Sequence, residues 1–194
     1  SLKAASIIGR IFQFEHLHKY YPSLGSAEQV KSDLQVMERL DLTPLDTPEP
    51  DLTYLFKHLV THEVGYESIV FSTRAHLHGQ YAEYLERAYP DQIDKLTPQF
   101  AHHYEKAGIR GKARFYLSKA GEQAAASFAN EEALSYFNRA LDVVDDKTSR
   151  DRFDILMKRE RVYDLLGRRR EQRQDLDALF SLTGGFDDSV QLRT

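Results

Sequence analysis

Histidine is the residue type with the widest chemical range in this chain, and several of its eight histidines are closely spaced. His58 and His62 are one helical turn apart and Glu63 follows directly, so this segment could supply zinc ligands. Further imidazoles occur in two close pairs, His76 with His78 and His102 with His103. However, the HExxH pattern is absent, and spacing alone does not bring three ligands together. We therefore interpret these histidines as solvated or capping residues and predict no metal site.

Paired carboxylates are the second group that could do chemistry, as general acid and base. The two candidate pairs are Glu83 with Glu86 and Asp145 with Asp146. Such catalysis needs carboxylates that converge in a dry pocket, whereas these pairs fall on polar helix faces. The chain has no cysteine, and the phosphate-binding pattern GxxxxGK[ST] is absent, so nothing in it cradles a triphosphate. The sequence predicts no catalytic residues.

Length and charge limit the remaining classes of protein. A chain of 194 residues with 41% hydrophobic residues can form two small domains. The net charge is -4, and the first 97 residues carry 9 basic against 14 acidic side chains, which disfavours binding to nucleic acid or anionic membranes. No apolar run approaches the roughly 18 residues of a membrane span. We expect a cytoplasmic protein and, because the chain opens with Ser1 and not Met, a piece of a longer polypeptide.

The elements of the first half predict a winged-helix-like domain over residues 1–61. Helices are expected over three segments, the last capped by Ser26: residues 2–9, 14–21 and 27–40. Two short extended segments around a proline-rich tip then predict a β-hairpin over residues 42–57. Helical periodicity from residue 62 to 88, ended by Pro90, predicts one long connecting helix within residues 62–97.

The second half, residues 98–194, predicts a helical array. The pattern Ala113-x-x-Tyr116-Leu-x-x-Ala120 recurs twenty positions later as Ala133-x-x-Tyr136-Phe-x-x-Ala140. Small residues one turn apart let helices pack closely, so we interpret this half as tetratricopeptide-like. Helices are expected at residues 98–108, 111–128 and 131–145, with turns at Gly108 and Gly167 and a last helix that ends at Gly184-Gly185. Because twenty residues are too few for a full repeat, the second helix of one repeat should continue as the first helix of the next.

Several short runs resemble a known family when their order is considered together. They are Leu55-Phe56-Lys57-His58, Glu63-Val64-Gly65-Tyr66-Glu67-Ser68, Arg74-x-x-Leu77-His78, and Ala101-His102-His103-Tyr104 with Lys112-Ala113. The arrangement over residues 2–145 resembles the region after the ATPase core in STAND-class signalling ATPases. These include MalT-like and LuxR-like regulators and predicted ATPases linked to class III adenylate cyclases, and the last branch is the most similar. The resemblance implies a missing upstream domain that binds ATP or ADP, followed by a winged helix and a helical array that relays signals.

The resemblance also gives His58 a role. A histidine just after the winged-helix strand of STAND proteins can reach the phosphates of the bound nucleotide. His58 occupies a comparable position, and Lys57 adds positive charge beside it. The alternative is that His58 only caps or packs the junction between strand and helix.

Our leading hypothesis is a non-catalytic regulatory module that binds a protein partner or another part of its own polypeptide. Arrays of this kind bind through the concave face of their first helices, which would place His103, Lys106 and Arg110 near one rim. One alternative is a fragment that contributes directly to ATP hydrolysis or cyclic-nucleotide synthesis. The other alternative is a DNA-binding winged helix, although its expected recognition helix is acidic overall. The compact basic run is Arg168-Arg169-Arg170 with Arg173. Acidic residues such as Asp175 follow it, as on a solvated helix.

Overall fold

The computed structural model describes residues 1–144 and 150–191, and the side chains of its last helix as far as Thr183. It is mainly helical, with one small antiparallel sheet, as the sequence predicts. The chain forms two compact units, Ser1–Ile93 and Asp94–Thr194. This boundary differs from the expected division into residues 1–61, 62–97 and 98–194. The helix Leu59–Glu67 packs against the helix Leu2–Ile8, and the helix Phe71–Ala88 packs against Leu2–Ile8 and Phe14–Tyr20, so both belong to the first unit.

The first unit begins with three helices, α1 (Leu2–Ile8), α2 (Phe14–Tyr20) and α3 (Ala27–Arg39). Helix α3 starts where the sequence indicates. The Ser26 hydroxyl accepts a hydrogen bond from the Gln29 backbone N–H, and the Gln29 side chain accepts one from the Ser26 N–H, which together form a capping box. The buried stripe of α3 consists of Val30, Leu34 and Met37. A short 3-10 turn, Pro22–Leu24, separates α2 from α3.

The sheet contains one more strand than expected. β2 (Leu45–Thr47) and β3 (Thr53–Leu55) form the expected hairpin, and β1 (Ile11–Gln13) pairs with the other edge of β3. Phe12 lies opposite Tyr54 in the register, and their rings stack with centroids 5.9 Å apart. Both side chains are buried together with Phe56, so the sheet covers the helices through one aromatic face. β1 is only three residues long, which explains why periodicity does not reveal it.

The expected long helix over residues 62–88 is wrong. The structure has two helices there, α4 (Leu59–Glu67) and α5 (Phe71–Ala88). The Ser68 hydroxyl donates to the Gly65 carbonyl, and Val70 has an extended backbone, so the helical ladder stops between them. The break turns Ile69 into the core, where it is 5% exposed. A second 3-10 turn, Pro90–Gln92, closes the first unit.

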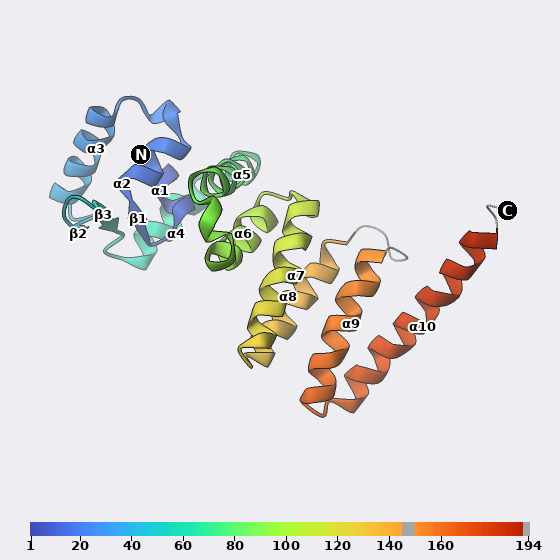
Figure 1. Cartoon of the computed structure of the whole chain (residues 1–194). Coiled ribbons are helices and arrows are strands. Elements are labelled where there is room, and N and C mark those ends of the chain that lie inside the picture. The colour runs from blue at the N-terminus through green and yellow to red at the C-terminus, as the bar shows by residue number, and fades with distance from the viewer. Residues whose placement is uncertain (145–149, 192–194) are drawn as a thin grey trace. The chain divides into compact units, whose positions relative to one another are not determined.

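The second unit contains α6 (Ile93–Lys106), α7 (Arg110–Ala126), α8 (Asn130–Asp142), α9 (Arg150–Leu165) and α10 (Arg169–Gln191). Helices α7 to α10 form a row of neighbours in which each packs against the next (Figure 1). Helix α7 lies between α6 and α8 in the chain, and the turns that contain Gly108 and Phe128 separate the three helices. Helix α10 continues through Gly184 and Gly185 to Gln191, so the expected end at these glycines is wrong.

Three turns of the second unit share one hydrogen-bonding pattern. The residue after the turn donates its N–H to a carbonyl five residues earlier, and each turn contains one residue with positive φ. This is the Schellman motif, which favours glycine because glycine carries no Cβ. The positive-φ residues are Gly108 (φ 69°), Phe128 (φ 61°) and Gly167 (φ 67°). The middle turn therefore places a phenylalanine where the other two have glycine.

Helix α6 begins five residues before the expected start at Pro98, which lies inside the helix. A proline has no N–H to donate to the carbonyl four residues earlier, which here belongs to Asp94. The Gln123 side chain of α7 donates to this carbonyl at 3.0 Å. The Asp94 carboxylate in turn pairs with Lys119 at 2.6 Å. Two residues of α7 thus hold the first turn of α6 and compensate for the proline.

Candidate interaction site

An open cleft of about 360 Å³ lies between α7 and α9 of the second unit. Helix α7 contributes one face at helical spacing, with Arg114, Phe115, Ser118, Lys119 and Glu122. Helix α9 contributes Asp151, Asp154, Ile155 and Lys158 at the same spacing. These two helices line the cleft while α8 packs against both of them. We refer to this feature as the α7/α9 cleft.

The charged side chains of the α7/α9 cleft are largely matched in pairs. Arg114 Nη1 lies 2.5 Å from Asp151 Oδ1, which joins the two walls. Lys158 pairs with Glu122 across the cleft, and its ammonium also donates to the Ser118 hydroxyl at 3.1 Å. The cleft is therefore polar but nearly neutral. Its main exposed apolar side chain is Phe115, which is 56% exposed.

The cleft lining is poorly suited to catalysis. Neither histidine nor cysteine is among the residues that line it. Ser118 is the one hydroxyl there, and its neighbour Lys158 acts as a donor both to Ser118 and to Glu122. An ammonium in that role has no lone pair with which to take the serine proton, so the pair does not form a nucleophile with its base. The arrangement is suited to holding backbone and side chains of a bound segment.

His58 and Lys57 lie at the end of the sheet, where α4 begins. His58 is the N-cap residue of α4, but its side chain makes no capping hydrogen bond and is exposed. Lys57 is also exposed and forms an ion pair with Asp41. The imidazole of His58 is thus accessible in the first unit, while the ammonium of Lys57 already has a partner. Both residues are distant in sequence from the α7/α9 cleft and do not line it.

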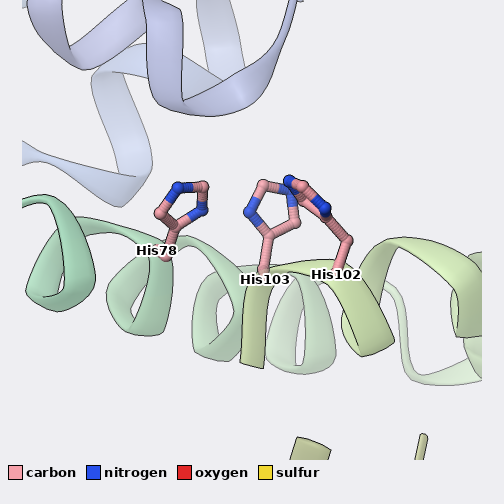
Figure 2. A group of neighbouring side chains, drawn as sticks. All are labelled: His78, His102 and His103. Carbon is pink, nitrogen blue, oxygen red and sulfur yellow. The ribbon is translucent and has the colours of Figure 1, made fainter. Parts of the chain in front are cut away.

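The three residues expected at a rim of the array lie outside the α7/α9 cleft. His103 is on α6 and only 4% exposed, whereas Lys106 and Arg110 are exposed at the end of α6 and the start of α7. Figure 2 shows His102 and His103 projecting from adjacent positions of α6, where their rings lie 5.0 Å apart at a steep angle. These three residues therefore lie outside the cleft, whose walls come from α7 and α9.

The remaining histidines and carboxylates of the sequence analysis lie in other settings. His62 Nε2 lies 3.0 Å from the Ser6 carbonyl oxygen, and its ring packs edge-on against Phe56. His78, on α5 (Figure 2), is buried, and its Nε2 lies 2.9 Å from the Tyr66 hydroxyl oxygen. Asp145 and Asp146 lie outside the described residues.

Two features weigh on DNA recognition by the first unit. Lys31, a basic residue of α3, forms an ion pair with Glu49 of the hairpin at 2.8 Å. Asp33, two residues further along α3, accepts a hydrogen bond from the Ser1 hydroxyl and adds negative charge to the helix. A surface that reads DNA presents its cations to phosphate, and α3 instead uses one of its few cations within the protein.

Comparison of the chain with protein-family models, with curated proteins and with solved structures yields no match. In the described part of the chain, none of the helices combines the length and the apolar character needed to cross a membrane. No family model, curated protein or solved structure thus indicates a function for the α7/α9 cleft or for either unit.

Proposed function

We propose that this chain is a non-catalytic interaction module whose second unit binds a protein segment in the α7/α9 cleft. The observation that carries the proposal is the cleft itself, an open groove between two neighbouring helices with side chains that can form hydrogen bonds and ion pairs. Grooves of this kind between helices of stacked hairpins commonly bind extended or helical segments. The segment belongs to a separate protein or to another part of the same polypeptide.

The proposal includes the finer architecture expected from the sequence. The three helices and small sheet of the first unit are compatible with a winged helix, and the helical hairpins of the second unit are compatible with a tetratricopeptide-like array. In this interpretation the cleft is formed by the first helices of two successive hairpins, α7 and α9. Binding in the second unit and nucleotide state in a separate ATPase domain would then be linked through the first unit.

His58 is the residue through which we propose that nucleotide state is sensed. Its exposed imidazole at the start of α4 supports this role because it is accessible to a ligand. Substitution His58→Ala in the whole protein should alter nucleotide-dependent activation, whereas His18→Ala on α2 should not. Unchanged activation of the His58 variant would remove the sensing role and leave the binding role of the cleft intact.

A direct test of the binding role uses the whole 194-residue chain. A random library of twelve-residue peptides is selected against it, and enriched peptides are measured by fluorescence anisotropy. We expect peptides that bind the wild-type chain and lose at least tenfold in affinity when Ser118→Arg fills the cleft. Failure to enrich any such peptide would overturn the proposed function.

The competing enzymatic role is tested by turnover. ATP hydrolysis and cyclic-nucleotide formation are measured with the isolated chain in the presence of magnesium. We expect no turnover above background, because the sequence has no phosphate-binding loop and the cleft has no catalytic pair. Turnover that Ser118→Ala or Lys158→Ala abolishes would establish the enzymatic alternative instead.

A further inference from the structure

Phe128 has a backbone conformation that is unfavourable for its residue type. It lies in the turn between α7 and α8 with φ 61°, in the conformation that Gly108 and Gly167 adopt in the two equivalent turns. For a residue with a Cβ this conformation costs roughly 1 kcal/mol or more. The side chain is 85% exposed, so folding recovers little of this cost through burial. A strained and exposed aromatic residue at a turn is more consistent with binding than with stability.

The turn of Phe128 lies beyond the α7/α9 cleft along α7, six residues after Glu122, the last residue of α7 that lines the cleft. It directly follows α7, and an ion pair between Arg168 and Glu131 connects it with the turn between α9 and α10. Figure 1 shows these two turns at the same end of the helical row. Leu165 is the last residue of α9 and is 72% exposed. It follows Lys158 by seven residues, which is two helical turns, so it continues the cleft-facing side of α9.

Charge at this end of the helical row differs from charge within the cleft. Inside the cleft, cations and carboxylates are matched, as in the Arg114–Asp151 pair. Arg161 lies on α9 between Lys158 and Leu165, is exposed and forms no ion pair with the described residues. This end therefore presents the Arg161 guanidinium together with two exposed apolar side chains, Phe128 and Leu165. Its chemical complement is a carboxylate next to a large apolar side chain.

The distance along α7 from Phe115, inside the cleft, to Phe128, beyond it, sets the spacing on the partner. Phe115 and Phe128 are thirteen residues apart, about 20 Å at 1.5 Å per helical residue. An extended peptide covers that distance with about six residues at roughly 3.3 Å each. We infer that the α7/α9 cleft binds an extended peptide segment carrying two large apolar side chains about six residues apart, with a carboxylate near the one that contacts Phe128. This inference rests on the proposed function and specifies the partner of the same cleft.

The test uses the peptides enriched from the twelve-residue library and three variants of the full chain. Phe128→Gly removes both the aromatic ring and the backbone strain. It should therefore raise the melting temperature of the chain and lower its affinity for the peptide by at least tenfold. Phe180→Ala is the matched control, since Phe180 is 82% exposed on α10 and lies away from the cleft, and it should leave affinity unchanged. Arg161→Glu should weaken the binding of a peptide that carries the carboxylate. When this carboxylate of the peptide is replaced by lysine, the Arg161→Glu variant should bind the peptide again.

The outcomes separate this inference from the proposed function. One outcome is that enriched peptides bind Ser118→Arg more weakly than wild type but bind Phe128→Gly as tightly as wild type. This outcome would overturn the inference and leave the proposed binding function intact. A consensus rich in lysine and arginine, or one without paired apolar residues, would overturn it as well. Absence of any enriched peptide overturns the proposed function itself. A rise in thermal stability of Phe128→Gly with loss of affinity supports the inference, because a residue needed for folding would behave in the opposite way.

Discussion

At the scale of single residues, His16 shows how burial determines chemistry in the first unit. Its Nδ1 lies 3.0 Å from the Tyr81 hydroxyl, and its Nε2 lies 2.8 Å from the Tyr89 hydroxyl. A neutral imidazole has one donor and one acceptor, so it satisfies both phenols at once. Burial lowers the pKa of His16 below its ordinary value of 6.5, with Glu15 opposing and Lys19 adding to this shift. The neutral form of His16 is therefore part of the folded first unit.

This environment predicts a loss of stability in mild acid. The pKa of His16 is lower in the folded than in the unfolded chain, so its contribution is complete above about pH 6.5. As the pH falls below 6.5, the unfolded chain takes up a proton that the folded chain resists, and the free energy of unfolding decreases by up to about 1.4 kcal/mol per pH unit. Urea unfolding of wild type, His16→Gln and His18→Gln at pH 7.5 and 5.5 measures this.

We expect His16→Gln to be less stable than wild type at pH 7.5 but to lose less on acidification. His18, on the same helix, is the control, and His18→Gln should keep the wild-type dependence on pH. An unchanged pH dependence in His16→Gln would contradict the argument.

Gly121 is a second residue whose role depends on one neighbour. A Cβ at this position would lie 2.6 Å from Cε1 of Phe137, whose ring fills the space between α7 and α8. Gly121→Ala should therefore destabilise the second unit by about 1–3 kcal/mol, although alanine is the better helix former. Gly111, on the same helix, has open space around it, and Gly111→Ala should be neutral or stabilising by up to about 1 kcal/mol. Thermal unfolding of both variants provides the comparison, and equal effects would refute the close packing at Gly121.

At the scale of elements, what the sequence could predict depends on how local each signal is. The start of α3 follows from Ser26 and Gln29, which are three residues apart and bond each other. The break between α4 and α5 has no glycine or proline to mark it. It depends on burial of Ile69 and on Lys3, whose ammonium donates to the Ser68 carbonyl from 65 residues away. Local patterns cannot reveal such distant contacts.

The α7/α9 cleft escaped sequence analysis for the same reason. Its walls contain Ser118 and Lys158, which are forty residues apart and meet only after α8 has packed beside both helices. The turn at Phe128 was also hidden, because a phenylalanine gives no sign of a left-handed backbone. The repeat itself did contain a clue, since Phe128 lies twenty residues after Gly108. Aligning the two repeats would have placed Phe128 in a glycine position.

Asp175 connects three helices, contrary to the interpretation of its segment as a solvated surface. It is 2% exposed on α10 and forms two hydrogen bonds with the Arg159 guanidinium of α9, at 2.5 and 2.9 Å. The same guanidinium donates to the Asn138 side chain of α8 at 2.6 Å. The planar group of Arg159 thus fixes the relative positions of α8, α9 and α10.

Removal of the Asp175 carboxylate should strongly destabilise the second unit. Asp175→Ala leaves a partly buried guanidinium without its partner and should lower the free energy of unfolding of the second unit by about 3 kcal/mol. The control is Asp177→Ala on the exposed side of α10, with an expected change within about 0.5 kcal/mol. Denaturant unfolding measures both. The double variant Arg159→Met with Asp175→Leu should be more stable than Asp175→Ala alone. The opposite order would show that the unpaired guanidinium does not cause the loss of stability in Asp175→Ala.

At the scale of the whole molecule, the division into two units leads to a prediction about fragments. Each unit has its own buried core, so a fragment that contains residues 94–194 should fold independently. A fragment that begins at Pro98, the boundary indicated by sequence, lacks the first turn of α6. It loses Asp94, which contacts both Lys119 and Gln123, and Thr97, which is fully buried.

The two fragments should therefore differ in stability although they differ by only four residues. Loss of one ion pair, one hydrogen bond and one buried side chain amounts to about 1–2 kcal/mol, which lowers the melting temperature of a domain of this size by roughly 5–10 °C. Circular dichroism of both fragments, acetylated at their N-termini, measures the difference. Equal melting temperatures would mean that α6 is stable without its first turn and that Pro98 is the true start of the second unit. A lower melting temperature for the shorter fragment would show that the side chains of α7, and not the proline, determine where α6 begins.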